Sequence, residues 1–128
     1  MATELTDSIL KTIKKMIGPS EDYDYFDTDL IIHINTAMSL LIQRGMPAFS
    51  ITGETETWND YIQDRVDLNM IKSYIYFKVK IAFDPPQSSF VLESYKKQAD
   101  ELEWRLEAVV DPSEIGAPVS SASDGDDD

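Results

Sequence analysis

The chain has 128 residues, 42% of them hydrophobic, with 11 basic and 24 acidic side chains and a formal charge of −13, which suits one modest domain. Binding to nucleic-acid phosphates depends on Lys and Arg, so this charge argues against a protein that grips DNA, although it permits a wall that repels DNA. The absence of cysteine excludes disulfides and thiolate zinc sites, and no run reaches the ~20 apolar residues of a membrane helix.

The first expected helix covers residues 4–17, with Thr3 as its N-cap. Its apolar stripe consists of isoleucines at a spacing of four: Ile9, Ile13 and Ile17. Gly18 and Pro19 should end it, because Gly suits a left-handed cap and Pro cannot continue the helical hydrogen bonds. The N-terminal sequence MATELTDSIL has neither the basic start nor the apolar centre of a signal peptide, so we expect a soluble intracellular protein.

Residues 20–29 (SEDYDYFDTD) combine five acids with three aromatics and are predicted to form a turn. Asp27 or Thr28 can cap the helix that follows over residues 29–44. This second helix is apolar almost all round, which predicts a central helix packed on several sides. Gly45 and Pro47 should close it.

The middle of the chain is expected to be irregular. Residues 49–53 alternate in polarity and are predicted to be briefly extended, and residues 54–64 to form one or two short helical turns. A third helix should run over residues 66–83. Its main stripe is Leu68, Ile71, Ile75, Val79 and Ala82. Pro85 and Pro86 force a stop, after which Ser88 or Ser89 can cap the last helix.

The last helix is expected over residues 90–110, with apolar residues at alternating spacings of three and four: Leu92, Tyr95, Ala99, Leu102, Leu106 and Val109. This is a heptad seam long enough to lie along another helix. The predicted fold is therefore all-α, a compact bundle of about four main helices with a short irregular central segment. Residues 1–110 form the domain, and residues 111–128, with six acids and no basic residue, form an acidic and flexible tail.

Trp104 is the most informative candidate for a functional residue. It follows Leu102 by two positions, on the side of the last helix away from the seam. Exposed Trp is costly in a monomer and enriched at interfaces, so we predict a contact between molecules; the alternative is that another element of the domain covers it. Trp58 and Phe49 are expected to belong to a satellite core.

The sequence offers no constellation for catalysis or metal binding. His33, four residues after Asp29, could be half of a catalytic pair, but no Ser or Cys nucleophile stands at a recognisable spacing. We therefore predict a hydrogen-bonded structural histidine, no enzyme activity and no cofactor. Five acids superficially resemble a calcium loop: Glu21, Asp22, Asp24, Asp27 and Asp29. They lack its central Gly and terminal Glu, so a solvated capping loop is the better interpretation.

Two long segments, residues 24–62 (DYFDTDLIIHINTAMSLLIQRGMPAFSITGETETWNDYI) and residues 70–108 (MIKSYIYFKVKIAFDPPQSSFVLESYKKQADELEWRLEA), carry a resemblance to a known family. In this order they resemble the small head–tail connector proteins, also called adaptor or head-completion proteins, of tailed bacteriophages that infect Gram-positive bacteria. The resemblance extends over about residues 5–110 and leaves out the tail.

The resemblance implies a helical subunit made in the host cytoplasm and assembled into a ring, with twelve copies expected, beneath the portal in the neck of the virion. One side would dock on the portal protein, the other would receive the next neck, stopper or tail-completion protein, and DNA would pass through the centre without specific binding. No membrane contact and no catalytic residue follow from it. Contacts with a neighbouring copy or the portal are expected at these positions: Pro85, Pro86, Phe90, Lys97, Trp104, Arg105 and Val110.

An alternative function is an acidic, DNA-mimicking inhibitor of a host or phage DNA-binding enzyme. Such a protein needs carboxylates spread over a folded face at the spacing of phosphates. Here residues 1–110 carry 11 basic and 18 acidic residues, a charge of −7, and the other six negative charges lie on the tail. This distribution counts against mimicry.

Overall fold

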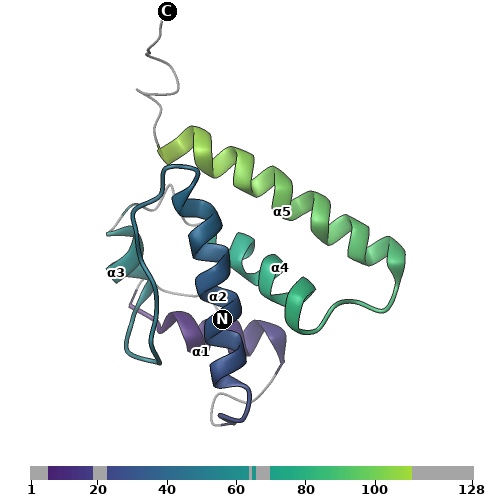
Figure 1. Ribbon diagram of the computed structural model, residues 1–128, viewed down its shortest axis with the longest axis horizontal. Coiled ribbons are helices and arrows are strands. Elements are labelled where there is room, and N and C mark those ends of the chain that lie inside the picture. Colours follow the sequence, from purple (N-terminus) through teal and green to yellow (C-terminus); the bar gives the residue numbers. More distant parts are fainter. Residues whose placement is uncertain (1–5, 19–22, 64, 66–69, 111–128) are drawn as a thin grey trace, which may run out of the picture.

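Five helices make up the regular structure of the described residues, which are 6–18, 23–63, 65 and 70–110 of the computed structural model. They are α1 (Ile9–Ile17), α2 (Asp27–Ile42), α3 (Trp58–Ile62), α4 (Ile71–Phe83) and α5 (Ser89–Val110). Figure 1 shows α5 running across one end of the bundle over α4, with α2 and α1 on the other side of α4. None of the described residues lies in a β-strand, and the predicted all-α bundle is confirmed.

Helix α1 begins later than predicted. Its N-cap is Ser8, whose Oγ accepts a hydrogen bond from the Lys11 backbone N at 3.2 Å. The residues just before it are held extended against the start of α3, because Ile9 N donates to Glu56 O at 3.0 Å and Trp58 N donates to Asp7 O at 3.2 Å. The predicted start at Glu4 is therefore wrong, and the predicted cap Thr3 lies outside the described residues. The predicted end at Gly18 is confirmed by its φ of 132°.

Helix α2 starts without a side-chain cap. Phe26 occupies the N-cap position, so the prediction that Asp27 or Thr28 caps the helix is wrong. The reason is a long-range contact: Asp27 Oδ1 lies 2.9 Å from Nζ of Lys14, whose side chain is completely buried. The carboxylate therefore compensates a buried cation instead of capping its own helix.

One face of α2 is buried against α4 and α1, and the opposite face is open. The buried residues are Leu30, Ile34, Ala37, Met38 and Leu41. Ile32 and Ile42 remain 57% and 39% exposed, so the helix is packed on fewer sides than its apolar sequence predicts. Gly45, with a φ of 105°, donates from its N to Ile42 O at 3.1 Å and turns the chain, as predicted.

The segment between α2 and α3 is not a strand; α2 holds it through the side chain of Asn35, which bonds both backbone groups of Ile51. Helix α3 then begins with a capping box, in which Thr57 Oγ1 accepts from Asp60 N at 3.1 Å and Asp60 Oδ2 accepts from Thr57 N at 2.9 Å. Trp58 follows and belongs to the main core instead of a satellite, with its side chain completely buried.

Helix α4 ends and α5 begins as the double proline predicts. Asp84 leaves helical geometry with φ −147° and ψ 68°, and Ser88 Oγ accepts from Val91 N at 3.3 Å, which makes Ser88 the cap of α5. The seam of α5 is confirmed: Ala99 and Leu106 are buried. Its other members are half-buried: Leu92, Tyr95, Leu102 and Val109. On α4, the buried face includes Tyr74 and leaves out Ala82, which is exposed. The apolar stripe predicted for this helix is therefore partly wrong.

Candidate functional site

The outer face of α5 carries a row of three residues at heptad spacing. Phe90, Lys97 and Trp104 are seven residues apart, so they lie on one line along the helix, on the side away from α4. Phe90 is 82% and Trp104 70% exposed, and Lys97 is exposed as well. With a rise of 1.5 Å per residue, this outer row is about 21 Å long. The sequence-based prediction that Trp104 faces away from the domain is confirmed.

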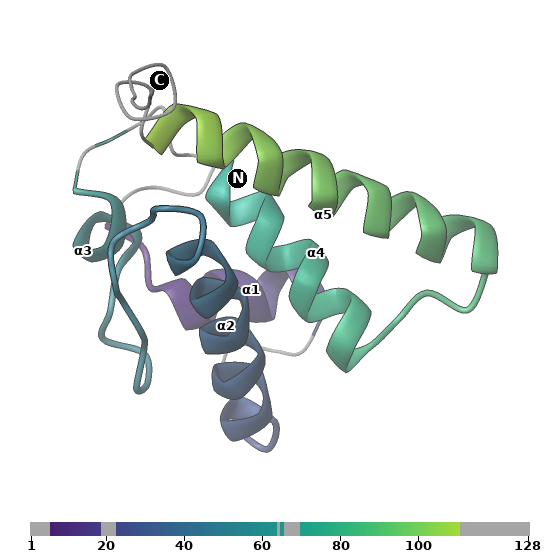
Figure 2. The ribbon, with the colours of Figure 1, turned by 45° about the horizontal axis from the view of Figure 1, so that its top comes forward.

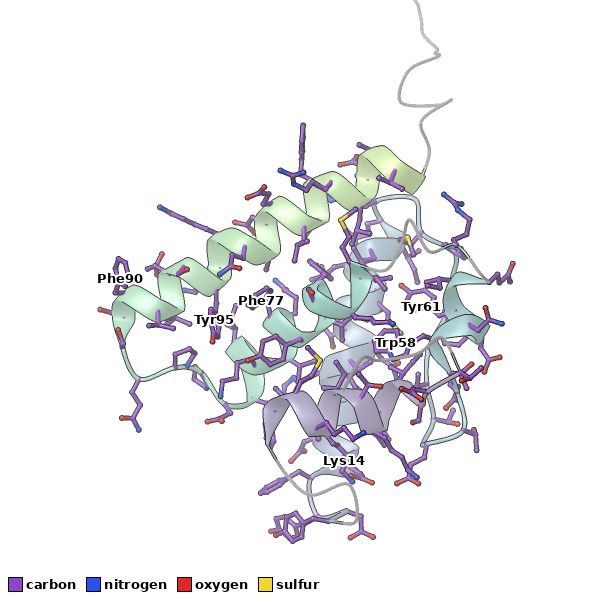
Figure 3. All side chains as sticks on the ribbon, turned by 180° about the vertical axis from the view of Figure 1, so that it is seen from behind. Lys14, Trp58, Tyr61, Phe77, Phe90 and Tyr95 are labelled. Carbon is purple, nitrogen blue, oxygen red and sulfur yellow. The ribbon has the colours of Figure 1, made fainter. Side chains whose placement is uncertain are left out.

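The first half of α5 projects beyond the end of α4 (Figures 1 and 2). None of its side chains from Ser89 to Gln98 is fully buried, and both ribbon views show this end reaching past α4 (Figures 1 and 2). Its support comes from an aromatic cluster in which Tyr95 lies 5.0 Å from Phe77 and 6.4 Å from Tyr76, ring centre to ring centre (Figure 3). Phe90 is thus presented at the tip of a protruding helix.

Two shallow hollows run along the flank of α5. One, of about 380 Å³, lies beside Phe90 and Lys97, and the other, of about 330 Å³, lies between α4 and α5 next to Phe77. Gln98 and Glu101 line both hollows, so the two lie next to each other along the helix. Aromatic and charged side chains both line these open hollows, which suit a docked side chain of another protein more than a small substrate.

Charges along this face are mostly neutralised within the helix. Arg105 Nη2 lies 2.7 Å from Glu101, one turn back, and Lys96 Nζ lies 3.7 Å from Glu93. Lys97 has no ion pair in the part of the chain that the structure describes. Of the predicted interface cations, Lys97 is therefore available to a partner, whereas Arg105 is already paired.

A network beside Trp104 anchors the second half of α5. The Glu103 carboxylate accepts hydrogen bonds from Arg44 Nε at 2.6 Å and from the Tyr74 hydroxyl at 3.0 Å. Arg44 Nη1 also donates a hydrogen bond to Glu107 at 3.4 Å. The hydrogen bond from Arg44 to Glu103 raises the pKa of the guanidinium. Sequence patterns could not reveal this network, because Arg44 and Glu103 are far apart in the chain. It joins the end of α2 to α4 and α5 and so holds Trp104 in place.

The corner before α5 is built by Pro85 and Pro86. Pro85 is exposed and Pro86 half-buried, and Lys80 Nζ bonds Asp84 Oδ2 at 2.9 Å just before them. The corner joins two packed helices and directs the start of α5 outward. The last predicted interface residue, Val110, ends α5, and its side chain lies outside the described part of the chain.

His33 does not behave as predicted from the sequence. Its ring is half-buried and meets Phe83 edge-on with ring centres 6.3 Å apart. No hydrogen bond to the ring is found within the described residues, so it is a packing residue and not a hydrogen-bonded one. Within the same residues, no three carboxylate or imidazole side chains gather as a metal site needs.

Comparison with known protein families gives a match to the family described as phage connector protein over residues 9–113. The chain belongs to this family. A phage connector protein is structural, is located in the neck of the virion and interacts with components of the head–tail junction. The resemblance noted in the sequence is therefore confirmed at the level of the family.

No curated protein and no solved structure gave a significant match to this connector protein. Among the helices of the described residues, none has the combination of length and hydropathy that crossing a membrane requires. The family indicates a protein that interacts with other components of the head–tail junction.

Proposed function

We propose that this connector protein is a structural adaptor that assembles as a ring of twelve subunits under the portal protein. The ring extends the DNA channel and provides the docking surface for the next neck or tail-completion component. The observation that carries this proposal is the outer row of α5, where Phe90 and Trp104 are mostly exposed on a helix whose other side is already packed on α4.

Exposed aromatics of this kind support protein–protein contact. Trp is among the residues whose truncation costs most in interfaces, commonly ~2 kcal/mol or more. In a monomer, two exposed aromatics on one helix would add only unfavourable apolar surface. We therefore assign the outer row of α5, together with the corner at Pro85 and Pro86, to contact with a neighbouring copy or with the portal.

The charge of the chain is compatible with a channel for DNA. Residues 1–110 carry a formal charge of −7, and a negative lumen lets DNA slide because it repels phosphates. Cations that could hold the DNA backbone are scarce on α5, where two of its three are paired with carboxylates of the same helix. DNA passes such a surface without being bound.

Mass measurement of the purified full-length chain, alone and mixed with the portal protein of the same phage, tests the proposal. A ring, or an assembly that forms only on portals, is the expected result. Trp104→Ala should raise the concentration for half-maximal assembly about 30-fold, as a loss of ~2 kcal/mol implies, and leave the melting temperature of the monomer nearly unchanged. Lys96→Ala, on the same helix but outside the row, is the matched control.

Two outcomes would contradict the proposal. If Trp104→Ala lowers the melting temperature of the monomer and leaves assembly intact, Trp104 is part of the folded core. A monomer that ignores the portal and binds a nuclease would instead support the DNA-mimicking alternative.

A further inference from the structure

A second exposed apolar surface lies at the start of α2, outside the surface assigned above. Tyr25 is 74% and Tyr23 50% exposed, and their rings lie 4.9 Å and 5.8 Å from that of Phe26, centre to centre. Phe26 in turn packs edge-on against Phe83 at the end of α4, at 5.2 Å. The two exposed tyrosines are therefore the outer members of an aromatic cluster that is anchored in the bundle.

Acidic side chains accompany these tyrosines. Asp24 and Asp29 are exposed, and neither forms an ion pair in the part of the chain that the structure describes. Ile32, 57% exposed, follows Asp29 by three residues and so lies on the same face of α2. We call this surface the acidic aromatic patch: Tyr23, Asp24, Tyr25, Asp29 and Ile32.

The patch is complementary to the outer row of α5. The row has a cation, Lys97, between two exposed aromatics, and the patch has two carboxylates among exposed apolar side chains. An ammonium group gains from a carboxylate and from the face of a tyrosine ring together. Lys97 of the row and Asp29 of the patch thus carry opposite charges, and each stands among exposed apolar side chains.

The two surfaces cannot meet within one molecule. The start of α2 points away from α5 in both ribbon views (Figures 1 and 2). Two different complementary surfaces on different sides of one subunit are what a head-to-tail contact requires, and such contacts form a ring when the rotation between copies closes.

We propose that the acidic aromatic patch of one copy binds the outer row of α5 of the next copy, with Lys97 against Asp29 and the tyrosines against Phe90 or Trp104. This inference rests on the proposed ring and assigns both of its contacting faces. It places the contact of α5 on a neighbouring copy, and not on the portal.

Charge reversal tests the pairing, with the number of copies bound to the portal protein as the readout. Lys97→Glu and Asp29→Lys should each raise the concentration for half-maximal assembly at least 10-fold, because like charges across an interface repel. The double variant, and a 1:1 mixture of the two single variants, should return to within about 3-fold of the unaltered chain, since each restores opposite charges at every contact.

Matched controls separate this effect from general changes of charge. Lys96→Glu on α5 and Glu54→Lys, at exposed positions outside the row and the patch, change the net charge equally and should leave assembly unchanged. Tyr25→Ser removes an exposed ring without altering charge and should weaken assembly several-fold. Circular dichroism confirms that each variant is folded.

The outcomes distinguish the inference from the proposed function. If Lys97→Glu weakens assembly and Asp29→Lys does not, α5 binds the portal and the inference is wrong while the ring stands. If both weaken it and neither the double variant nor the mixture recovers, the two residues do not face each other and the inference is also wrong. If the unaltered chain forms no ring on portals, the proposed function itself fails.

Discussion

The side-chain amide of Asn35 on α2 bonds both backbone groups of Ile51, donating from Nδ2 to the carbonyl at 3.0 Å and accepting at Oδ1 from the N–H at 2.8 Å. One side chain thus satisfies the donor and the acceptor that a neighbouring strand would otherwise satisfy. Ile51 is buried, so both groups are removed from water. A side chain of helix α2 therefore holds the irregular segment between α2 and α3 in place, and no neighbouring β-strand is needed.

Replacing Asn35 by Ala should lower the free energy of unfolding by about 1–3 kcal/mol, because it leaves a donor and an acceptor without partners. Urea unfolding followed by circular dichroism measures the change. Thr36→Ala, at the neighbouring exposed position that bonds only within α2, is the control and should change stability little. A loss as small as that of the control would mean that water replaces both bonds.

The buried ion pair between Lys14 and Asp27 makes a second prediction. Lys14→Met removes the cation beside Asp27 Oδ1, a buried oxygen that has no other polar partner among the described residues. An uncompensated buried charge costs about 3 kcal/mol, and thermal unfolding should show it. The double variant Lys14→Met with Asp27→Asn should recover much of the loss. No recovery would indicate that the charge of Asp27 is not what destabilises the single variant.

The two tryptophans should differ in both stability and spectrum. Trp58 is completely buried and donates from Nε1 to Thr12 Oγ1 at 3.0 Å, whereas Trp104 is 70% exposed. Trp58→Ala should cost about 3–5 kcal/mol and Trp104→Ala about 0.5 kcal/mol or less. Fluorescence of Trp104→Phe, which retains Trp58, should be blue-shifted and resist quenching by iodide, and that of Trp58→Phe should show the reverse. Equal quenching of the two variants would contradict the burial described above.

Alkaline pH should destabilise the protein through Tyr74. Its pKa is raised above the ordinary value of about 10, first by burial and then by the nearby Glu103. Because the folded state keeps this proton longer than the unfolded chain, the stabilisation is complete below pH ~10 and is lost as the pH rises further. Urea unfolding between pH 8 and 11 should show a steeper loss for the unaltered chain than for Tyr74→Phe. Identical slopes would rule out a contribution from Tyr74.

The proline corner should affect assembly more than folding. Replacing Pro85 and Pro86 by Ala frees the unfolded chain and should cost about 0.4–1 kcal/mol per residue. It also loosens the direction in which α5 leaves α4, so fewer rings should form on portals at a given concentration. Gln87→Ala, exposed in the same connection, is the control. If the double variant forms rings as well as the control does, the prolines only separate the two helices.

Local features of the fold were predictable from the sequence, and long-range ones were not. The stop at Asp84, a cap at Ser88 or Ser89, the turn at Gly45 and the outward position of Trp104 depend on residues within a few positions of each other, and all were predicted. The predicted start of α1 was wrong because the backbone of Asp7 pairs in an extended conformation with that of Trp58, which is distant in the chain. Periodicity and capping preferences carry no information on such pairs.

For the candidate site, the sequence by itself determined the acidic charge, the helical seam of α5 and hence the row that carries Phe90, Lys97 and Trp104. Only the tertiary structure decided that Arg44 anchors the second half of this helix, and that Tyr25 and Asp29 form a patch at the start of α2, away from α5. Helical periodicity specifies which residues share one face of one helix. The relative positions of two faces depend on how separate helices pack, which no local pattern encodes.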